Sequence, residues 1–143
     1  MKFIVNTDGG ARGNPGPAGI GFVISDGTRV VKQGSAYIGT ATNNVAEYEA
    51  LIRALTELKK VIPKEKRADA HIEIRMDSEL AVKQLSGTYQ IKDKPLQLQF
   101  MKIWNMRVAE FSHITFVHIP REENSAADAL VNKAIDNTSG VLL

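Results

Sequence analysis

The sequence contains no cysteine and carries almost no surplus charge of either sign. Its 143 residues include 18 Lys and Arg against 16 Asp and Glu, which gives a formal net charge of +2. Without cysteine the chain can form no disulfide, no thiolate nucleophile and no cysteine-based zinc site. A net charge of +2 is also far from the strongly basic composition of proteins that wrap nucleic acid non-specifically. A polyanion would have to be bound through a local surface, metal ions or neutral hydrogen-bond donors.

Long hydrophobic runs are missing as well. Only residues 3–5 form an apolar run near the start, whereas a secretory signal needs ~7–15 apolar residues and a spanning helix about 20. The length fits one globular domain. Such a domain can bury roughly two thirds of the surface that its unfolded chain exposes, so it needs no disulfide or structural metal for stability. We therefore expect one domain over residues 1–136 with a frayed tail over 137–143. We further expect a cytoplasmic monomer that needs no membrane and no obligate protein partner.

The hydrophobic pattern predicts an α/β fold. Alternating or β-branched apolar runs predict strands at 2–7, 20–25, 29–38, 71–76 and 113–119. Apolar residues at helical spacing predict helices at about 45–60, 78–86, 96–110 and 125–135. The Gly- and Pro-rich segment 9–19 is predicted to be a loop. Three leading strands favour an antiparallel meander, and strands joined by helices favour parallel neighbours. The expected architecture is a mixed five-stranded sheet with helices on both faces.

Four carboxylates stand at the edges of these predicted elements: Asp8, Glu47, Asp77 and Asp128. Two strand ends and two helix starts can converge on one edge of an α/β sheet, where such folds tend to bind ligands. Each acid also has a purely structural interpretation. Glu47 and Asp128 match helix-capping patterns that start at Asn44 and Ser125, and the other two could belong to a helix start and a turn.

Four segments carry a more specific signal than any single acid: NTDGGARGNPGPAGIG (6–21), TNNVAEYEAL (42–51), RMDSEL (75–80) and PREENSAADAL (120–130). In order and spacing they closely resemble type 1 ribonuclease H, the cellular RNase HI family, and the first two segments are the most specific. The resemblance covers essentially the whole chain. It implies the RNase H-like fold and hydrolysis of the RNA strand of RNA–DNA hybrids, which leaves 5′-phosphate and 3′-hydroxyl ends.

The resemblance implies metal-ion catalysis by the four acids. They would ligate Mg²⁺, for which Mn²⁺ substitutes in this family. Hard oxygen donors suit Mg²⁺, and two ions ~3.5–4 Å apart can activate water and stabilise the leaving oxygen. We expect Asp8 to bridge both ions, and the second ion to bind only with substrate. Because clustered carboxylates repel one another, at least one pKa should rise in the metal-free site.

The resemblance also implies which residues read the wide minor groove of the hybrid, where 2′-hydroxyls distinguish RNA from DNA. They are Gly9, Asn14, Thr42, Asn43, Asn44, Ser78 and Glu79. The three Asn would contact bases or sugars, Thr42 a DNA phosphate, and the Gly9 backbone a ribose hydroxyl, as would Glu47. Helix capping is the alternative for residues 42–44. Glu79 replaces the Gln of many members, so it could accept from a 2′-hydroxyl but would repel phosphate.

The sequence departs from the family pattern in two places. One is the loop before the last acid. The other is the basic helix-loop protrusion with which the longer members of the family bind the DNA strand. Many bacterial members carry a loop His, but His118 falls in a strand run, where we favour a structural role. Arg121 is the preferred substitute, in phosphate contact or product release, because Arg cannot act as a general base. In place of the protrusion the chain has only residues 89–95. We therefore expect a compact enzyme with a weak, salt-sensitive grip on the hybrid, for which Lys83, Lys92 and Lys94 would be a weak substitute.

Two further expectations remain open. At helical spacing, Phe100 and Trp104 are predicted to lie in the core rather than to stack on nucleic acid. Two alternative functions also stand beside ribonuclease H activity, namely a nuclease of the same fold acting on other nucleic acids and a catalytically weak hybrid-binding module. The presence of all four acids disfavours the second alternative, and the TDGG and TNNxxE segments disfavour the first.

Overall fold

A computed structural model describes the backbone of residues 1–142 and the side chains of residues 1–137. Its strands are β1 (Lys2–Ala11), β2 (Gly16–Ser25), β3 (Val30–Ala41), β4 (His71–Met76) and β5 (His113–His118). Its helices are α1 (Asn43–Val61), α2 (Glu79–Leu85), α3 (Lys94–Ala109) and α4 (Ser125–Leu142), with short 3-10 turns η1 (Lys64–Lys66) and η2 (Arg121–Asn124). None of the helices in this part of the chain has the length and apolar character needed to cross a membrane.

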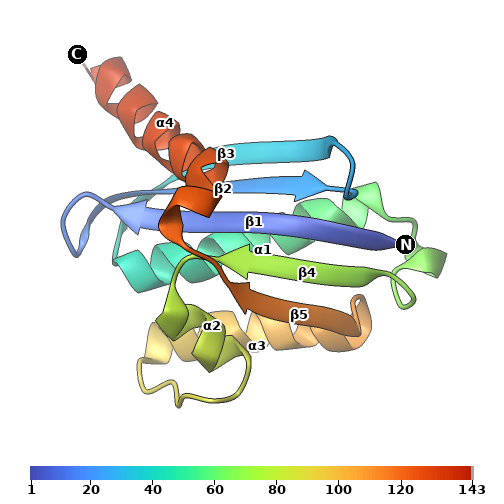
Figure 1. Cartoon of the computed structure of the whole chain (residues 1–143). Helices are drawn as coiled ribbons and strands as arrows, with labels where there is room; N and C mark the ends of the chain where they lie inside the picture. The colour runs from blue at the N-terminus through green and yellow to red at the C-terminus, as the bar shows by residue number, and fades with distance from the viewer. Residues whose placement is uncertain (143) are drawn as a thin grey trace.

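The five strands form one mixed sheet in the order β3-β2-β1-β4-β5. The first three strands pair antiparallel, whereas β1 with β4 and β4 with β5 pair parallel. Helix α1 packs on one face against β1 and β2, and α3 packs against α1. Helix α4 crosses the opposite face over β2 and β3 (Figure 1). The predicted mixed sheet with helices on both faces is therefore confirmed, and β1 is its central strand.

The Gly- and Pro-rich segment is mostly strand, so the prediction of a loop over residues 9–19 was wrong. β1 continues to Ala11 and β2 already starts at Gly16, with Gly10 opposite Gly19 in the antiparallel pair. β3 correspondingly extends past its predicted end, because Gly16 of the lengthened β2 pairs with Ala41. The first strand run thus does not end at Asp8, which lies inside β1.

The glycines of this hairpin allow two helices to approach the sheet backbone. A Cβ atom on Gly9 would lie 2.2 Å from the carbonyl oxygen of Ala46 in α1. A Cβ atom on Gly21 in β2 would lie 2.4 Å from the carbonyl oxygen of Ala127 in α4. Both distances are far shorter than a van der Waals contact, so only glycine fits at these positions. The close contacts place each helix directly on the main chain of the sheet.

The helix starts differ from the predictions because other side chains cap them. Helix α1 starts at Asn43, two residues early, because the Thr42 hydroxyl accepts a hydrogen bond from the backbone N–H of Val45 at 3.2 Å. Thr42, not Asn44, is therefore the N-cap residue. At the other end of the chain, α4 continues to Leu142, beyond its predicted end near residue 135. The predicted frayed tail, 137–143, includes side chains from residue 138 onward and residue 143, which lie outside the described residues.

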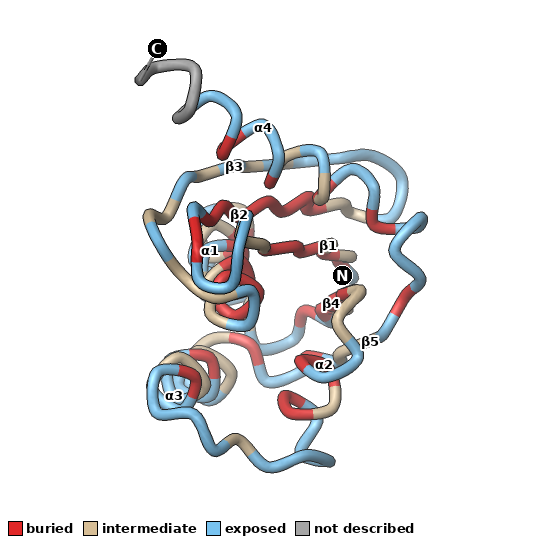
Figure 2. Tube along the Cα trace, turned by 90° about the vertical axis from the view of Figure 1, so that its left-hand side faces the viewer, coloured by how far each residue is buried: buried red, intermediate tan, exposed pale blue. Residues whose placement is uncertain are grey.

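Helix α3 contacts the core through a narrow stripe. Leu96 and Ile103 are buried and Phe100 is partly buried, but Trp104 is 49% exposed. The Trp104 ring stacks on Phe100 on the outer flank of the helix, with ring centroids 6.4 Å apart. The prediction of a core position for Trp104 was wrong, because α3 packs on α1 along one side only and its outer surface faces solvent (Figure 2).

Candidate functional site

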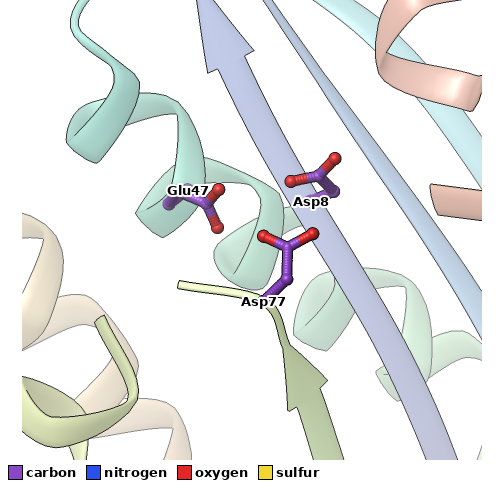
Figure 3. Close-up of side chains that lie close together, drawn as sticks. All are labelled: Asp8, Glu47 and Asp77. Carbon is purple, nitrogen blue, oxygen red and sulfur yellow. The ribbon is translucent and has the colours of Figure 1, made fainter. Parts of the chain in front are cut away.

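Three of the four acids converge where β1 and β4 run side by side. Asp8 lies in β1, Asp77 directly follows β4, and Glu47 comes from α1. One carboxylate oxygen from each lies within 4.8 Å of the others, and the three side chains point toward one another (Figure 3). Parallel pairing of β1 with β4 places the two aspartates near each other. The close approach of α1 to Gly9 brings Glu47 next to β1. Glu47 is the fifth residue of α1, outside its first turn, so the capping-box interpretation of this acid does not hold.

The cluster is buried and electrostatically unfavourable without a cation. Asp8 is 7% exposed and Glu47 is 8% exposed. Burial, followed by the charge of Asp77, raises the pKa of Asp8 to about 7. Burial, followed by the charges of Asp8 and Asp77, raises the pKa of Glu47 well above its usual range, and a hydrogen bond from the Gly9 backbone offsets this only partly. The Glu47 Oε2 atom is buried and has no hydrogen-bond partner among the residues whose side chains the structure describes. The raised pKa expected for clustered acids is therefore present.

The fourth acid, Asp128, interacts directly with Asp8. It raises the pKa of Asp8 through a side-chain hydrogen bond and through its charge. All four acids line one open cavity of about 260 Å³. Ser125, the proposed cap for Asp128, has the helical dihedral angles φ −62° and ψ −34°, so it does not have the extended geometry of a capping residue. Asp8 thus interacts both with Glu47 and Asp77, its partners in the cluster, and with the carboxylate of Asp128.

The Asn residues beside the cluster are oriented by the backbone. Asn14 Oδ1 accepts a hydrogen bond from the backbone N–H of Asn43 at 3.0 Å, and Asn43 Oδ1 accepts one from Ala11 at 2.9 Å. Because both amide oxygens are engaged, the NH₂ groups are the side-chain donors that remain for a ligand. Asn44 is exposed next to them, whereas the Thr42 hydroxyl caps α1.

Ser78 and Glu79 have structural contacts of their own at the start of α2. The Ser78 hydroxyl accepts from the backbone N–H of Ala81 and caps the helix. Glu79 forms an ion pair with Lys83 at 3.1 Å, and this contact lowers the pKa of its carboxyl group. A role for either residue in reading a groove stays a prediction.

Arg121 and His118 are placed differently. Arg121 lines the cavity of the four acids, whereas His118, the exposed last residue of β5, is not among the described residues that line it. Arg12 and Asn132 also line the cavity, and sequence reasoning missed both. Arg12 follows the TDGG segment and is ion-paired with Asp136 of α4 at 2.6 Å. Its position in a glycine-rich hairpin gave no signal, because only the fold brings α4 to that hairpin.

Comparisons with known proteins agree with this geometry. Residues 6–134 match a family model described as "Reverse transcriptase-like". LC11-RNase H1, isolated from compost and solved in complex with an RNA/DNA hybrid, is 52% identical over 95% of this chain and 98% of its own, with a TM-score of 0.90. RNase H1 from the halophilic archaeon Halobacterium salinarum is 38% identical over 96% of this chain and 99% of its own, with a TM-score of 0.87. The chain belongs to the ribonuclease H1 family.

Some relatives are considerably longer than this chain. A bifunctional protein of Mycobacterium tuberculosis is 38% identical over 138 residues, which cover 95% of this chain but 36% of that protein. The chain thus spans about a third of the length of its mycobacterial relatives, so an RNase H1 domain of this kind also occurs as one part of a larger polypeptide.

The raised pKa values make the stability of the metal-free protein depend on pH. Asp8 has an ordinary pKa of 3.8 and a folded value of about 7, so between these values the folded state binds more protons than the unfolded state. The free energy of unfolding should therefore fall as pH rises from 4 to 7, by about 4 kcal/mol at most for this one group. Urea unfolding in EDTA at pH 5 and pH 8 measures this. If the free energy of unfolding at pH 8 is the same in EDTA as in Mg²⁺, the assignment of the acid cluster as a metal site is contradicted.

Proposed function

We propose that this chain is an endoribonuclease that hydrolyses the RNA strand of RNA–DNA hybrids. The observation that carries the proposal is the buried cluster of Asp8, Glu47 and Asp77 with Asp128 beside it, placed next to the oriented amides of Asn14 and Asn43. The membership of the chain in the ribonuclease H1 family supports the same conclusion, as does the RNA/DNA hybrid bound by the similar LC11-RNase H1.

The donor set suits Mg²⁺. All four carboxylates offer the hard oxygen ligands that this ion prefers, and the unpartnered Oε2 atom of Glu47 needs a cation or a proton. Asp8, Glu47, Asp77 and Asp128 would hold the metal, with Asp8 shared between two ions and Mn²⁺ as a substitute. Bound Mg²⁺ supplies activation of the attacking water and stabilisation of the leaving 3′-oxygen, which gives a 5′-phosphate and a 3′-hydroxyl. We expect the second ion to bind only when the hybrid is present.

The residues of the chain contribute binding, orientation and charge. Asp8 and Glu47 must release protons before they can act as ligands, because both pKa values are raised. The NH₂ groups of Asn14 and Asn43 can donate to the acceptors that every base pair presents in the minor groove. These donors are neutral, so the chain can recognise the hybrid with a net charge of only +2. Arg121 would contact phosphate and transfer no proton.

A cleavage assay on four labelled substrates tests the proposal. Hybrid, duplex RNA, duplex DNA and single-stranded RNA are incubated with the protein in Mg²⁺, in Mn²⁺ and in EDTA, with Glu47→Gln as a variant of nearly equal size. We expect cleavage of the hybrid alone, in either metal but not in EDTA, and little cleavage by the variant. Binding of the hybrid without cleavage would identify a binding module. Equal cleavage of duplex RNA or duplex DNA would identify a nuclease of different substrate class.

Asn14→Ala should weaken substrate binding more than it slows the chemical step. The substitution removes an amide donor and also the acceptor that holds the backbone of Asn43. We expect KM for the hybrid to rise about tenfold, equivalent to about 1.4 kcal/mol of binding free energy, with a smaller change in kcat. Steady-state kinetics measures both. Asn105→Ala, at an exposed position on α3, is the matched control and should leave KM unchanged.

A further inference from the structure

One buried polar side chain near the site is not among the proposed ligands. Asn124 is the last residue of η2, directly before α4, and is 1% exposed. Burying an amide is unfavourable unless its donors and acceptor find partners. The partners of Asn124 therefore indicate why an amide stands there rather than an apolar residue.

The Asn124 amide joins three parts of the chain that carry the acids. Its Nδ2 donates to the backbone oxygen of Thr7 at 2.9 Å and to Asp77 Oδ2 at 3.2 Å. Its Oδ1 accepts from Asn6 Nδ2 at 3.1 Å. The orientation of the amide is unambiguous, because a flipped amide would place Oδ1 against two acceptors. Both Nδ2 hydrogens are thus used, one on the residue before Asp8 and one on Asp77 itself.

The position of Asp77 is less firmly fixed by the backbone than the positions of Asp8 and Glu47, so it depends more on the contact with Asn124. Asp8 lies inside β1 and Glu47 inside α1, so backbone hydrogen bonding fixes both. Asp77 lies between the end of β4 and the start of α2, outside both elements, and is less buried than the other two acids. Asn124 donates one hydrogen bond to the Asp77 carboxylate and another to the Thr7 backbone in β1, and it thereby connects the carboxylate to β1. Asn124 also directly precedes the helix that carries Asp128.

We propose that Asn124 is a positioning residue that holds the Asp77 carboxylate at the spacing from Asp8 that metal binding requires. The inference rests on the proposed function insofar as these acids bind Mg²⁺. An amide suits this role because it donates two hydrogen bonds and adds no negative charge to the cluster. Groups that orient metal ligands in this way typically change metal affinity about 10- to 100-fold when removed.

Calorimetric titration of Mg²⁺ into the hybrid-free protein tests the proposal without reference to cleavage. For Asn124→Ala we expect the Mg²⁺ affinity to fall about 10- to 100-fold, while KM for the hybrid changes less than about twofold because Asn14 and Asn43 are untouched. The matched control is Asn6→Ala, which removes the partner of Oδ1 but leaves both bonds from Nδ2. Its Mg²⁺ affinity should change much less. An affinity of folded Asn124→Ala equal to that of the unsubstituted protein would overturn the proposal.

A second measurement needs no variant and applies even if Asn124→Ala does not fold. In the unsubstituted protein, the side-chain NH₂ protons of Asn124 should exchange slowly with solvent, and their NMR signals should shift when Mg²⁺ is added. Rapid exchange of these protons, or chemical shifts that do not change when Mg²⁺ is added, would overturn the proposal. The proposed function can fail separately. A protein that binds Mg²⁺ through this cluster but cleaves no hybrid would leave the role of Asn124 intact while refuting ribonuclease activity.

Discussion

Asp8→Asn should lower the rate of hybrid cleavage at least about a thousandfold, equivalent to about 4 kcal/mol of transition-state stabilisation, and should stabilise the metal-free protein at neutral pH. Both effects have one cause. Asp8 is the acid that adjoins all three others, so its charge is needed by a bound cation and repelled by its neighbours without one. An uncharged amide loses the ligand and removes the repulsion. Single-turnover cleavage and urea unfolding in EDTA measure the two effects.

The half-buried hairpin residue Asp26 provides a control of opposite sign. Backbone hydrogen bonds from Thr28 and Arg29 lower the pKa of Asp26 to about 2, so its charged form stabilises the fold. Asp26→Asn should therefore slightly destabilise the protein at neutral pH and leave cleavage unchanged. Asp8→Asn should also reduce the fall in stability between pH 5 and pH 8. If Asp8→Asn cleaves as fast as the unsubstituted protein, Asp8 is not a metal ligand in the reaction.

Gly9→Ala should be the most destabilising of the substitutions considered. The added methyl group would lie 2.2 Å from the carbonyl oxygen of Ala46 and 2.6 Å from the backbone nitrogen of Glu47. Neither atom belongs to a flexible side chain, so α1 must shift away from β1. We expect a loss of about 3 kcal/mol or more, at the upper end of typical overpacking costs, together with a severe loss of cleavage because Glu47 moves with α1. Thermal unfolding and cleavage rates measure the two losses.

The neighbouring residue provides the matched control for this substitution. A Cβ atom on Gly10 would meet its nearest neighbour, Val131 Cγ1, at 3.9 Å, which is an ordinary contact. Gly10→Ala should therefore stay near the unsubstituted protein in both stability and cleavage rate. Equal effects at the two positions would show that loss of glycine flexibility in β1, rather than the approach of α1, determines the outcome.

The convergence of the four acids, which the sequence predicted, is present in the structure, whereas their surroundings were predicted less well. The four carboxylates were found because they stand in motifs and at changes of hydrophobic period, which are local signals. The prediction of a loop over residues 9–19 was wrong because glycine normally indicates a turn. Only the positions of α1 and α4 reveal that the glycines of this segment are needed for helix packing. Trp104 was misplaced because helical spacing defines a face but not whether anything covers it.

Asn124 shows a different limit of sequence reasoning. In the sequence it is a polar residue just before a predicted helix, and nothing next to it indicates its partners. Its actual partners, Thr7, Asp77 and Asn6, lie 117, 47 and 118 residues away. No local pattern can connect residues at such separations, so its proposed role required the fold.

The two close contacts of the sheet determine what sets the distance between the acids. Gly9 touches α1 at Ala46, one residue before Glu47, and Gly21 touches α4 at Ala127, one residue before Asp128. At both points the helix atom nearest to the added Cβ would be a main-chain carbonyl oxygen. The positions of Glu47 and Asp128 relative to the sheet therefore depend on contact between main chains more than on the volumes of core side chains, whereas Asp77 lies on neither helix. We therefore expect a change of hydrophobic side-chain volume elsewhere in the core to alter the positions of these two acids less than a methyl group at Gly9 or Gly21 would.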